Sequence, residues 1–184
     1  MSDRTYFGSY LGKHTMAVSF PDCVKTAQPN TDTLVLALGN PLRGDDGVGV
    51  AVLLSLVDSC GLPPGTTLRQ CSLSGLIDEL LSEHYRRAII IDAIEMGVSP
   101  GTWIRFQMPH DEVTSMVLES CEALHDLNLV EVLALGEALH LLPLEIVVYG
   151  IQPQEAGWGP TMSKPVQVAV EKVKNVILEE LSDR

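Results

Sequence analysis

Short apolar segments that alternate with helix-like segments are the feature that most constrains the fold of this chain. TLVLALG, AIIID and LEIVVYGI are nearly free of polar residues, as strands buried on both faces of a sheet are. A weaker strand pattern is present in the segment TTLRQCS. Apolar and polar residues alternate in the segment TWIRFQM, as in a strand with one face exposed to solvent. The predicted strands are 33–39, 66–72, 88–92, 102–108 and 144–151. The predicted helices are 47–59, 76–84, 127–142 and 164–181.

Strands separated by helices indicate βαβ units with right-handed crossovers. We therefore expect one three-layer α/β/α domain with a mostly parallel, twisted sheet of about five strands. The strand over 102–108 is the expected antiparallel exception. Residues 1–30 show no periodicity and are predicted to be a flexible N-terminal extension, which leaves 31–184 as the domain.

The net charge and the spacing of the cysteines limit the partners and the location that we expect for this protein. There are 24 acidic and 12 basic residues, a net charge of −12, which makes nucleic acid and anionic membrane surfaces poor partners. No apolar run reaches the roughly 18 residues that a membrane-spanning helix needs, and the start lacks a signal-peptide core. The four cysteines form no CxxC pair. We expect reduced thiols, a cytoplasmic location and a monomer.

Acidic residues follow two of the predicted strands, and parallel strands end at the same edge of a sheet. Asp45 and Asp46 lie in the loop GNPLRGDDG after the first strand, and Asp92 ends the third. One of the adjacent pair could cap the next helix, which leaves the other free to face the cleft. Gly47 and Gly49 would allow close approach to the backbone there. Asp92 could cap a turn, or its charge could be compensated by a cation.

A histidine in the second half of the chain could complete a metal site. His125 directly precedes Asp126, a good N-cap for the helix over 127–142. His140 is expected to be a core histidine, and Cys121, four residues before His125, a core thiol. Two carboxylates and one imidazole suit nickel or zinc and leave coordination positions open. No Gly-x-Ser-x-Gly elbow is present.

Three segments together resemble the [NiFe]-hydrogenase maturation endopeptidases. LALGNPLRGDDGVGVAV is similar to the family's glycine-loop signature, AIIIDAIEMG to its strand ending in Asp-Ala, and HDLNLVEVLAL to its His-x-Leu-x-Leu segment. VVYGIQPQEAGWGPTMS resembles the family's last strand and the loop after it. The resemblance covers roughly residues 33–181, and its fold would be phosphorylase/hydrolase-like.

The resemblance implies a function and a ligand set. These enzymes remove a C-terminal peptide from the hydrogenase large-subunit precursor after nickel insertion. The family's metal ligands correspond to Asp46, Asp92 and His125, which would also be the catalytic residues, and the substrate would supply the nickel. Asp45 would then organise the turn or cap the helix. Trp158, in the loop EAGWGPT, would contact the substrate or be structural.

Two other functions are compatible with parts of the sequence. Peptidyl-tRNA hydrolases also carry a GLGNPG-like loop after a first strand, but here the loop continues as LRGDDG, and the net charge is unfavourable for tRNA. A non-catalytic escort of the nickel-loaded large subunit would need the same binding site without cleavage.

Overall fold

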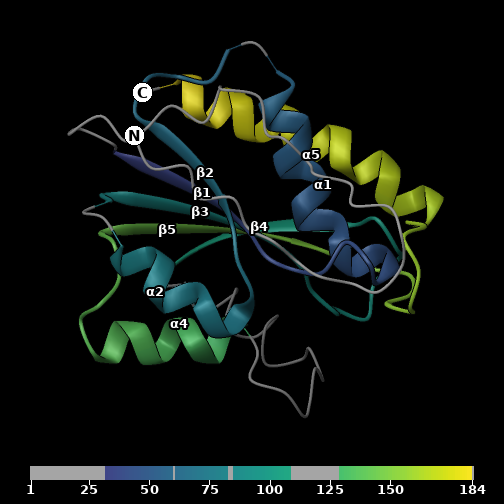
Figure 1. The fold of residues 1–184 in the computed structure, drawn as a ribbon, viewed down its shortest axis with the longest axis horizontal. Helices are drawn as coiled ribbons and strands as arrows, with labels where there is room; N and C mark the ends of the chain where they lie inside the picture. The colour runs from purple at the N-terminus through teal and green to yellow at the C-terminus, as the bar shows by residue number, and fades with distance from the viewer. Residues whose placement is uncertain (1–31, 60, 83–84, 109–128, 184) are drawn as a thin grey trace, which may run out of the picture.

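Five strands form one sheet in the order β2-β1-β3-β5-β4 (Figure 1). The computed structural model describes residues 32–59, 61–82, 85–108 and 129–183. All neighbouring strands pair in parallel except β4, which is antiparallel to β5. The predicted mostly parallel sheet and its antiparallel exception are confirmed. The strands are β1 (Thr33–Ala37), β2 (Thr66–Gln70), β3 (Arg87–Ala93), β4 (Trp103–Met108) and β5 (Glu145–Ile151).

Helices cover both faces of the sheet, which confirms the three-layer prediction. Figure 1 shows α1 (Val48–Val57) and α5 (Lys164–Ser182) on one face, and α2 (Leu76–Leu81) and α4 (Leu129–Ala138) on the other. Short 3₁₀ turns, η1 (Gly44–Gly47) and η2 (Leu73–Gly75), lead into α1 and α2. None of the helices in the described ranges is long and apolar enough to cross a membrane.

Successive side chains of the central strands point to opposite faces of the sheet, so the protein has two separate hydrophobic cores. In β3, Ile89 and Ile91 pack with α1 and α5, whereas Ala88 and Ile90 pack with α2 and α4. All four are fully buried. This two-sided burial explains why the strands are continuous apolar runs, and each Ile contributes about 1.5–3 kcal/mol to stability. The predicted apolar face of α5 is confirmed, because Val166, Val170, Val173 and Ile177 are all buried.

A partly buried ionic network joins α5 to the sheet. Glu180 of α5 accepts hydrogen bonds from Arg105 at 2.6 and 3.1 Å, and also from Arg87 and the Tyr149 hydroxyl. Arg87 is buried and lies 3.3 Å from Glu145 as well. Burial alone would raise the pKa of Glu180, but these donors and charges outweigh it and lower the pKa to about 2.

Helix α4 is shorter than predicted. It ends at Ala138, and the chain then turns through His140, whose φ is 56°. The N–H groups of His140 and Leu141 donate to the carbonyls of Glu137 and Gly136, both at 2.9 Å, as at a helix C-terminus. His140 is exposed, so the prediction of a core histidine is wrong.

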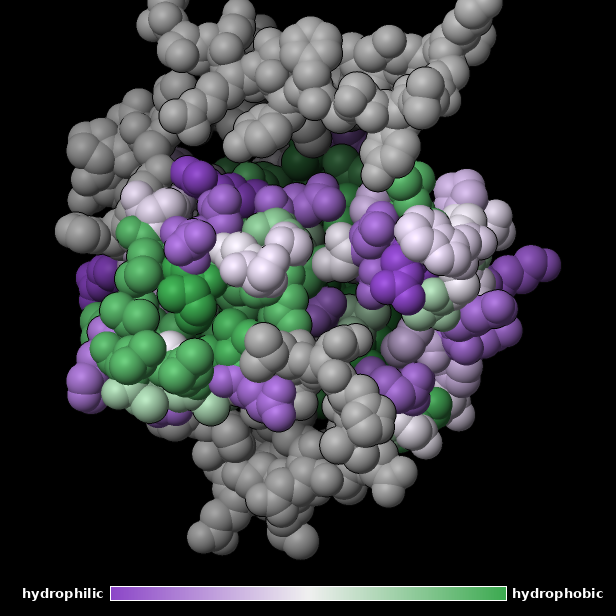
Figure 2. Space-filling model, turned by 60° about the horizontal axis from the view of Figure 1, so that its bottom comes forward, coloured by the Kyte–Doolittle hydropathy of each residue, from purple (hydrophilic) through white to green (hydrophobic). Residues whose placement is uncertain are grey.

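Exposed apolar residues explain the overlong helix prediction. Figure 2 shows apolar side chains gathered on part of the face that α2 and α4 form. Leu81, Leu135, Leu139 and Leu144 are exposed there. Because apolar residues continue beyond Ala138, and Leu139 among them is exposed, the hydrophobic pattern did not mark where the helix ends. The predicted N-terminal extension, residues 1–30, lies outside the described residues.

Candidate active site

The candidate site lies where β1 and β3 end. The two strands pair in parallel, so the loop after β1 and the end of β3 share the carboxyl edge of the sheet. Asp92 is the sixth residue of β3 and alternates with Ile91, so its side chain is directed to the same face as Ile90, toward the layer of α2 and α4. Asp46 reaches this edge from η1.

Asp46 is held by the loop that precedes it. Its Oδ2 accepts a hydrogen bond from the Asn40 N–H at 2.8 Å, and its own N–H donates to the Arg43 carbonyl at 3.2 Å. Gly39 makes this closed loop possible. Its φ is 100°, and a Cβ there would lie 1.9 Å from the Asp46 carbonyl oxygen. The sequence LGN therefore encodes a turn that returns Asp46 to the end of β1.

Asp92 faces a second negative charge. Its Oδ1 accepts a hydrogen bond from the Ala93 N–H at 2.8 Å. Burial raises the pKa of Asp92 to about 7, the hydrogen bond opposes this rise, and the charge of Asp46 adds to it. The two predicted ligands thus lie close enough to repel each other. A pair of this kind can share a proton or bind a cation, and the charge pattern is unfavourable for an anion.

Asp45 points away from this pair and holds a different loop. Its side chain is buried, and its Oδ2 accepts hydrogen bonds from the N–H groups of Gln154 (2.8 Å) and Glu155 (3.2 Å). Ser163 donates its N–H to Oδ1 at 2.6 Å and its hydroxyl to Oδ2 at 2.8 Å. These bonds outweigh the effect of burial and lower the pKa of Asp45.

The proposed capping role of the acidic pair is therefore wrong. The N-cap of α1 is Gly47, and no side chain caps that helix. Asp45 instead joins η1 to the start of α5, a contact between residues more than 100 positions apart. Its other predicted role was to organise its own turn after β1, but the hydrogen bonds of its side chain hold the loop between β5 and α5 instead.

Gly47 and Gly49 provide space for the protein's own backbone. A Cβ on Gly47 would lie 2.7 Å from the Cα of Pro41, and one on Gly49 would lie 2.5 Å from the Ile91 carbonyl oxygen and 2.6 Å from that of Leu38. The first turn of α1 therefore packs directly on the ends of β1 and β3. Close approach at these glycines is confirmed, and the group that approaches them is the neighbouring backbone.

His125, the third predicted ligand, lies outside the described residues, as do Cys121 and Asp126. Helix α4 begins at Leu129, four residues after His125, and only six residues separate its last residue from the start of β5. Its first residue consequently lies toward the carboxyl edge. Within the described part of the chain, no three His, Cys, Asp or Glu residues are grouped as a metal site.

Comparison with known proteins identifies the family. The hydrogenase maturation protease family matches residues 73–180. The chain belongs to this family. The matched region includes Asp92 and position 125, whereas Asp46 precedes it.

Individual proteins similar to this chain include two hydrogenase expression/formation proteins and one solved structure of similar fold. The hydrogenase expression/formation protein HoxM of Azotobacter vinelandii is 31% identical over 155 residues, which is 82% of this chain and 72% of that protein. HupM of Azotobacter chroococcum is 30% identical with the same coverage. The hydrogenase maturating endopeptidase HybD from Escherichia coli has a similar fold, with a TM-score of 0.67 at 22% identity, over 83% of this chain and 93% of that structure.

Gln152 is a residue of this maturation protease site that sequence reasoning missed. It follows β5 directly and is buried. Its Nε2 donates to Glu95 at 2.7 Å, and its Oε1 accepts the N–H of Met96 at 2.7 Å. Gln152 therefore ties the loop after Asp92 to the end of β5. The rule that singled out Asp92, a polar residue ending a buried strand, would have found it.

Cys71 is the one cysteine among the residues that the structure describes. It follows β2, and its N–H donates to the Ala37 carbonyl at 3.1 Å. Burial raises the pKa of its thiol to about 12, and the charges of Glu79 and Asp92 add to the rise. At neutral pH the group is a thiol and not a nucleophilic thiolate. It is partly buried, in line with the expected reduced thiol.

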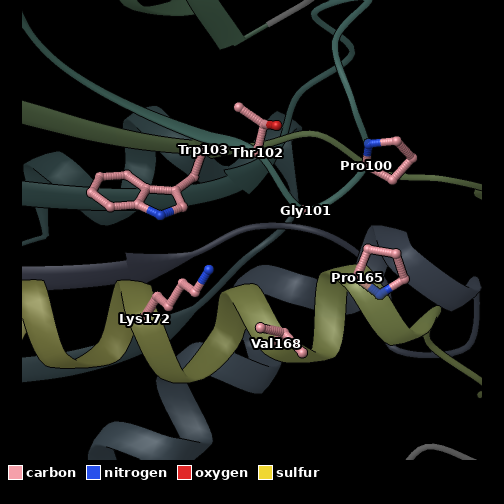
Figure 3. A pocket seen from close by; sticks show the side chains of 7 residues that line it. All are labelled: Pro100, Gly101, Thr102, Trp103, Pro165, Val168 and Lys172. Atoms are coloured by element: carbon pink, nitrogen blue, oxygen red, sulfur yellow. The ribbon is translucent and has the colours of Figure 1, made fainter.

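A shallow groove of about 490 Å³ lies apart from the carboxylates. Figure 3 shows Trp103 at the start of β4 opposite Val168 and Lys172 of α5. The groove is on the α5 side of the sheet, whereas Asp92 shares the other side with Ile90. It contains neither Asp46 nor Asp92, so the chemistry of the candidate site is not located there.

Proposed function

We propose that this hydrogenase maturation protease is an endopeptidase that removes the C-terminal extension of a [NiFe]-hydrogenase large-subunit precursor after nickel has been inserted. One observation carries the proposal: two carboxylates from separate elements, Asp46 of η1 and Asp92 of β3, lie at the carboxyl edge of the sheet. Family membership supplies the reaction class. Nickel is a part of the substrate here and not a resident cofactor.

The donor chemistry of the site fits a divalent cation. Asp46 and Asp92 repel each other, so a bound cation would relieve a charge conflict that burial makes costly. His125 is the proposed third ligand, and an imidazole with two carboxylates suits nickel. When bound, the metal could polarise the scissile carbonyl or activate water. Recognition of nickel would act as a checkpoint, because a precursor without nickel offers these residues no cation to bind.

The backbone contacts give each carboxylate a fixed position before substrate arrives. Asp46 is oriented by the Asn40 N–H and Asp92 by the Ala93 N–H. Cys71 contributes no thiolate nucleophile, and the proposed hydrolysis uses water. Serine- and cysteine-protease inhibitors should therefore leave cleavage unaffected.

The test is cleavage of purified large-subunit precursor, with and without nickel, followed as a mobility shift on a gel. We expect cleavage of the nickel-loaded precursor only. Asp46→Ala, Asp92→Ala and His125→Ala should each lower cleavage by at least about 100-fold while retaining the fold, and a second ligand change should add little to the first.

Two matched controls keep this test specific. Asp58→Ala removes an exposed carboxylate at the end of α1, and Cys71→Ser changes the one thiol in the described part of the chain. Both should cleave normally. Cleavage of nickel-free precursor in the presence of a chelator, or normal cleavage by His125→Ala, would contradict the proposed ligand set. Binding of the loaded precursor without any cleavage would favour the escort function.

A further inference from the structure

Two loops at the carboxyl edge are joined into one surface. The Gly44 N–H donates to the Gly159 carbonyl at 2.6 Å, and the Gly159 N–H donates to the Leu42 carbonyl at 2.9 Å. Arg43 and Gly159 thereby form an isolated parallel bridge. The loop after β1 and the loop after β5 hold each other in place through backbone hydrogen bonds, so the side chains that they carry are displayed on a defined backbone.

This joined edge displays Leu42, Arg43 and Trp158, which we call the Trp158 platform. Trp158 is 84% exposed and Leu42 is 54% exposed. The guanidinium carbon of Arg43 lies 6.0 Å from the centroid of the Trp158 ring. Trp and Arg are the residues most enriched among energetic hot spots of protein interfaces. An aromatic ring, an aliphatic side chain and a cation held together on the surface have the chemistry of a peptide-binding site.

The platform is rigidly coupled to the candidate site. The Arg43 carbonyl accepts the N–H of Asp46, so Arg43 and the proposed metal ligand belong to one hydrogen-bonded turn. The buried carboxylate of Asp45 holds the loop that carries Trp158 through Gln154, Glu155 and Ser163. A peptide bond presented to Asp46 would therefore place the neighbouring substrate residues over the platform.

We propose that the Trp158 platform binds the C-terminal extension of the precursor next to the scissile bond. This rests on the proposed function. An apolar side chain of the extension packs on Trp158 and Leu42, and an acidic side chain pairs with Arg43. Arg43 selects the acidic group, because its guanidinium is a cation beside the Trp158 ring and a carboxylate of the extension would pair with it.

The test compares binding of two forms of the nickel-free large subunit, the full precursor and the same subunit truncated at the cleavage site. The wild-type protein should bind the full precursor about tenfold more tightly, which is typical of one hot-spot cluster. Trp158→Ala should abolish this difference, Trp158→Phe should retain most of it, and Arg43→Gln should reduce it and weaken its dependence on salt. Leu144→Ala, which alters another exposed apolar residue (85% exposed), should change nothing.

The outcomes separate this inference from the proposed function. Equal binding of the two forms by the wild type, or an unchanged difference in Trp158→Ala and Arg43→Gln, would overturn the platform even if the enzyme cleaves. A difference that depends on Trp158, with no cleavage of nickel-loaded precursor, would retain the platform and overturn the endopeptidase. Melting temperatures of the variants should stay close to that of the wild type, because the altered side chains are exposed.

Discussion

Replacement of Asp45 by alanine should destabilise the fold far more than loss of a helix cap. The buried carboxylate accepts four hydrogen bonds, three of them from backbone N–H groups. A hydrogen bond to a charged group contributes about 1.5–3 kcal/mol, so the simple sum would be about 6–12 kcal/mol. Two terms reduce it. Gln154 and Glu155 are exposed, so water can reach their freed N–H groups, and the variant no longer buries a charge.

We therefore expect Asp45→Ala to lower the free energy of unfolding by about 3–5 kcal/mol. Urea denaturation at pH 7, followed by far-UV circular dichroism, measures this change. Ser163→Ala is the matched control: it removes the hydroxyl donor but keeps the Ser163 N–H, and should lower stability by only about 1.5–2 kcal/mol, the low end for one hydrogen bond to a charged group. Asp45→Asn retains one acceptor oxygen and should fall between the two.

The pH dependence provides a second measurement of the same effect. The pKa of Asp45 is lowered in the folded state, so its stabilisation is complete above the unfolded pKa of about 3.9 and is lost as the pH falls through the folded value. Wild type and Asp45→Asn should therefore converge in stability at low pH. The reasoning would be refuted if Asp45→Ala lost less than about 1 kcal/mol at pH 7, or no more than Ser163→Ala does.

Three further changes test other parts of the structure. Gly49→Ala should cost about 1–3 kcal/mol in urea denaturation, because its Cβ would meet two backbone carbonyls, whereas Gly61→Ala, with open space around it, should be nearly neutral. Glu180→Gln should lower the free energy of unfolding by about 2–3 kcal/mol at pH 7. Because folding lowers the pKa of Glu180 to about 2, the difference from wild type should shrink as the pH falls from about 4.5 toward 2. Asp92→Asn should raise the melting temperature of the metal-free protein more at pH 8 than at pH 5, because the raised pKa of about 7 makes the ionised carboxylate unfavourable for folding. An equal melting temperature for Asp92→Asn and wild type at pH 8 would show that the ionised Asp92 carboxylate does not destabilise the metal-free fold.

Hydrophobic pattern alone determined the architecture of this protein. The run AIII before Asp92 is apolar at every position because β3 buries Ile89 and Ile91 on one face and Ala88 and Ile90 on the other. The order of elements then required parallel pairing, which brings Asp46 and Asp92 to one edge. Both consequences follow from local sequence and from general rules of chain connection, so they could be predicted before any coordinates were known.

Helix ends and side-chain partners were decided only by the tertiary structure. The pattern did not show where α4 ends, because apolar residues such as the exposed Leu139 continue beyond its last turn. Nor did it show that Asp45 holds Ser163, since the two residues are 118 positions apart and their contact exists only when η1 and the start of α5 have been packed together. A carboxylate has the same local propensities whether it caps the next helix or binds a distant loop. Which of these Asp45 and Asp46 does depends on the donors that the complete fold places around each one.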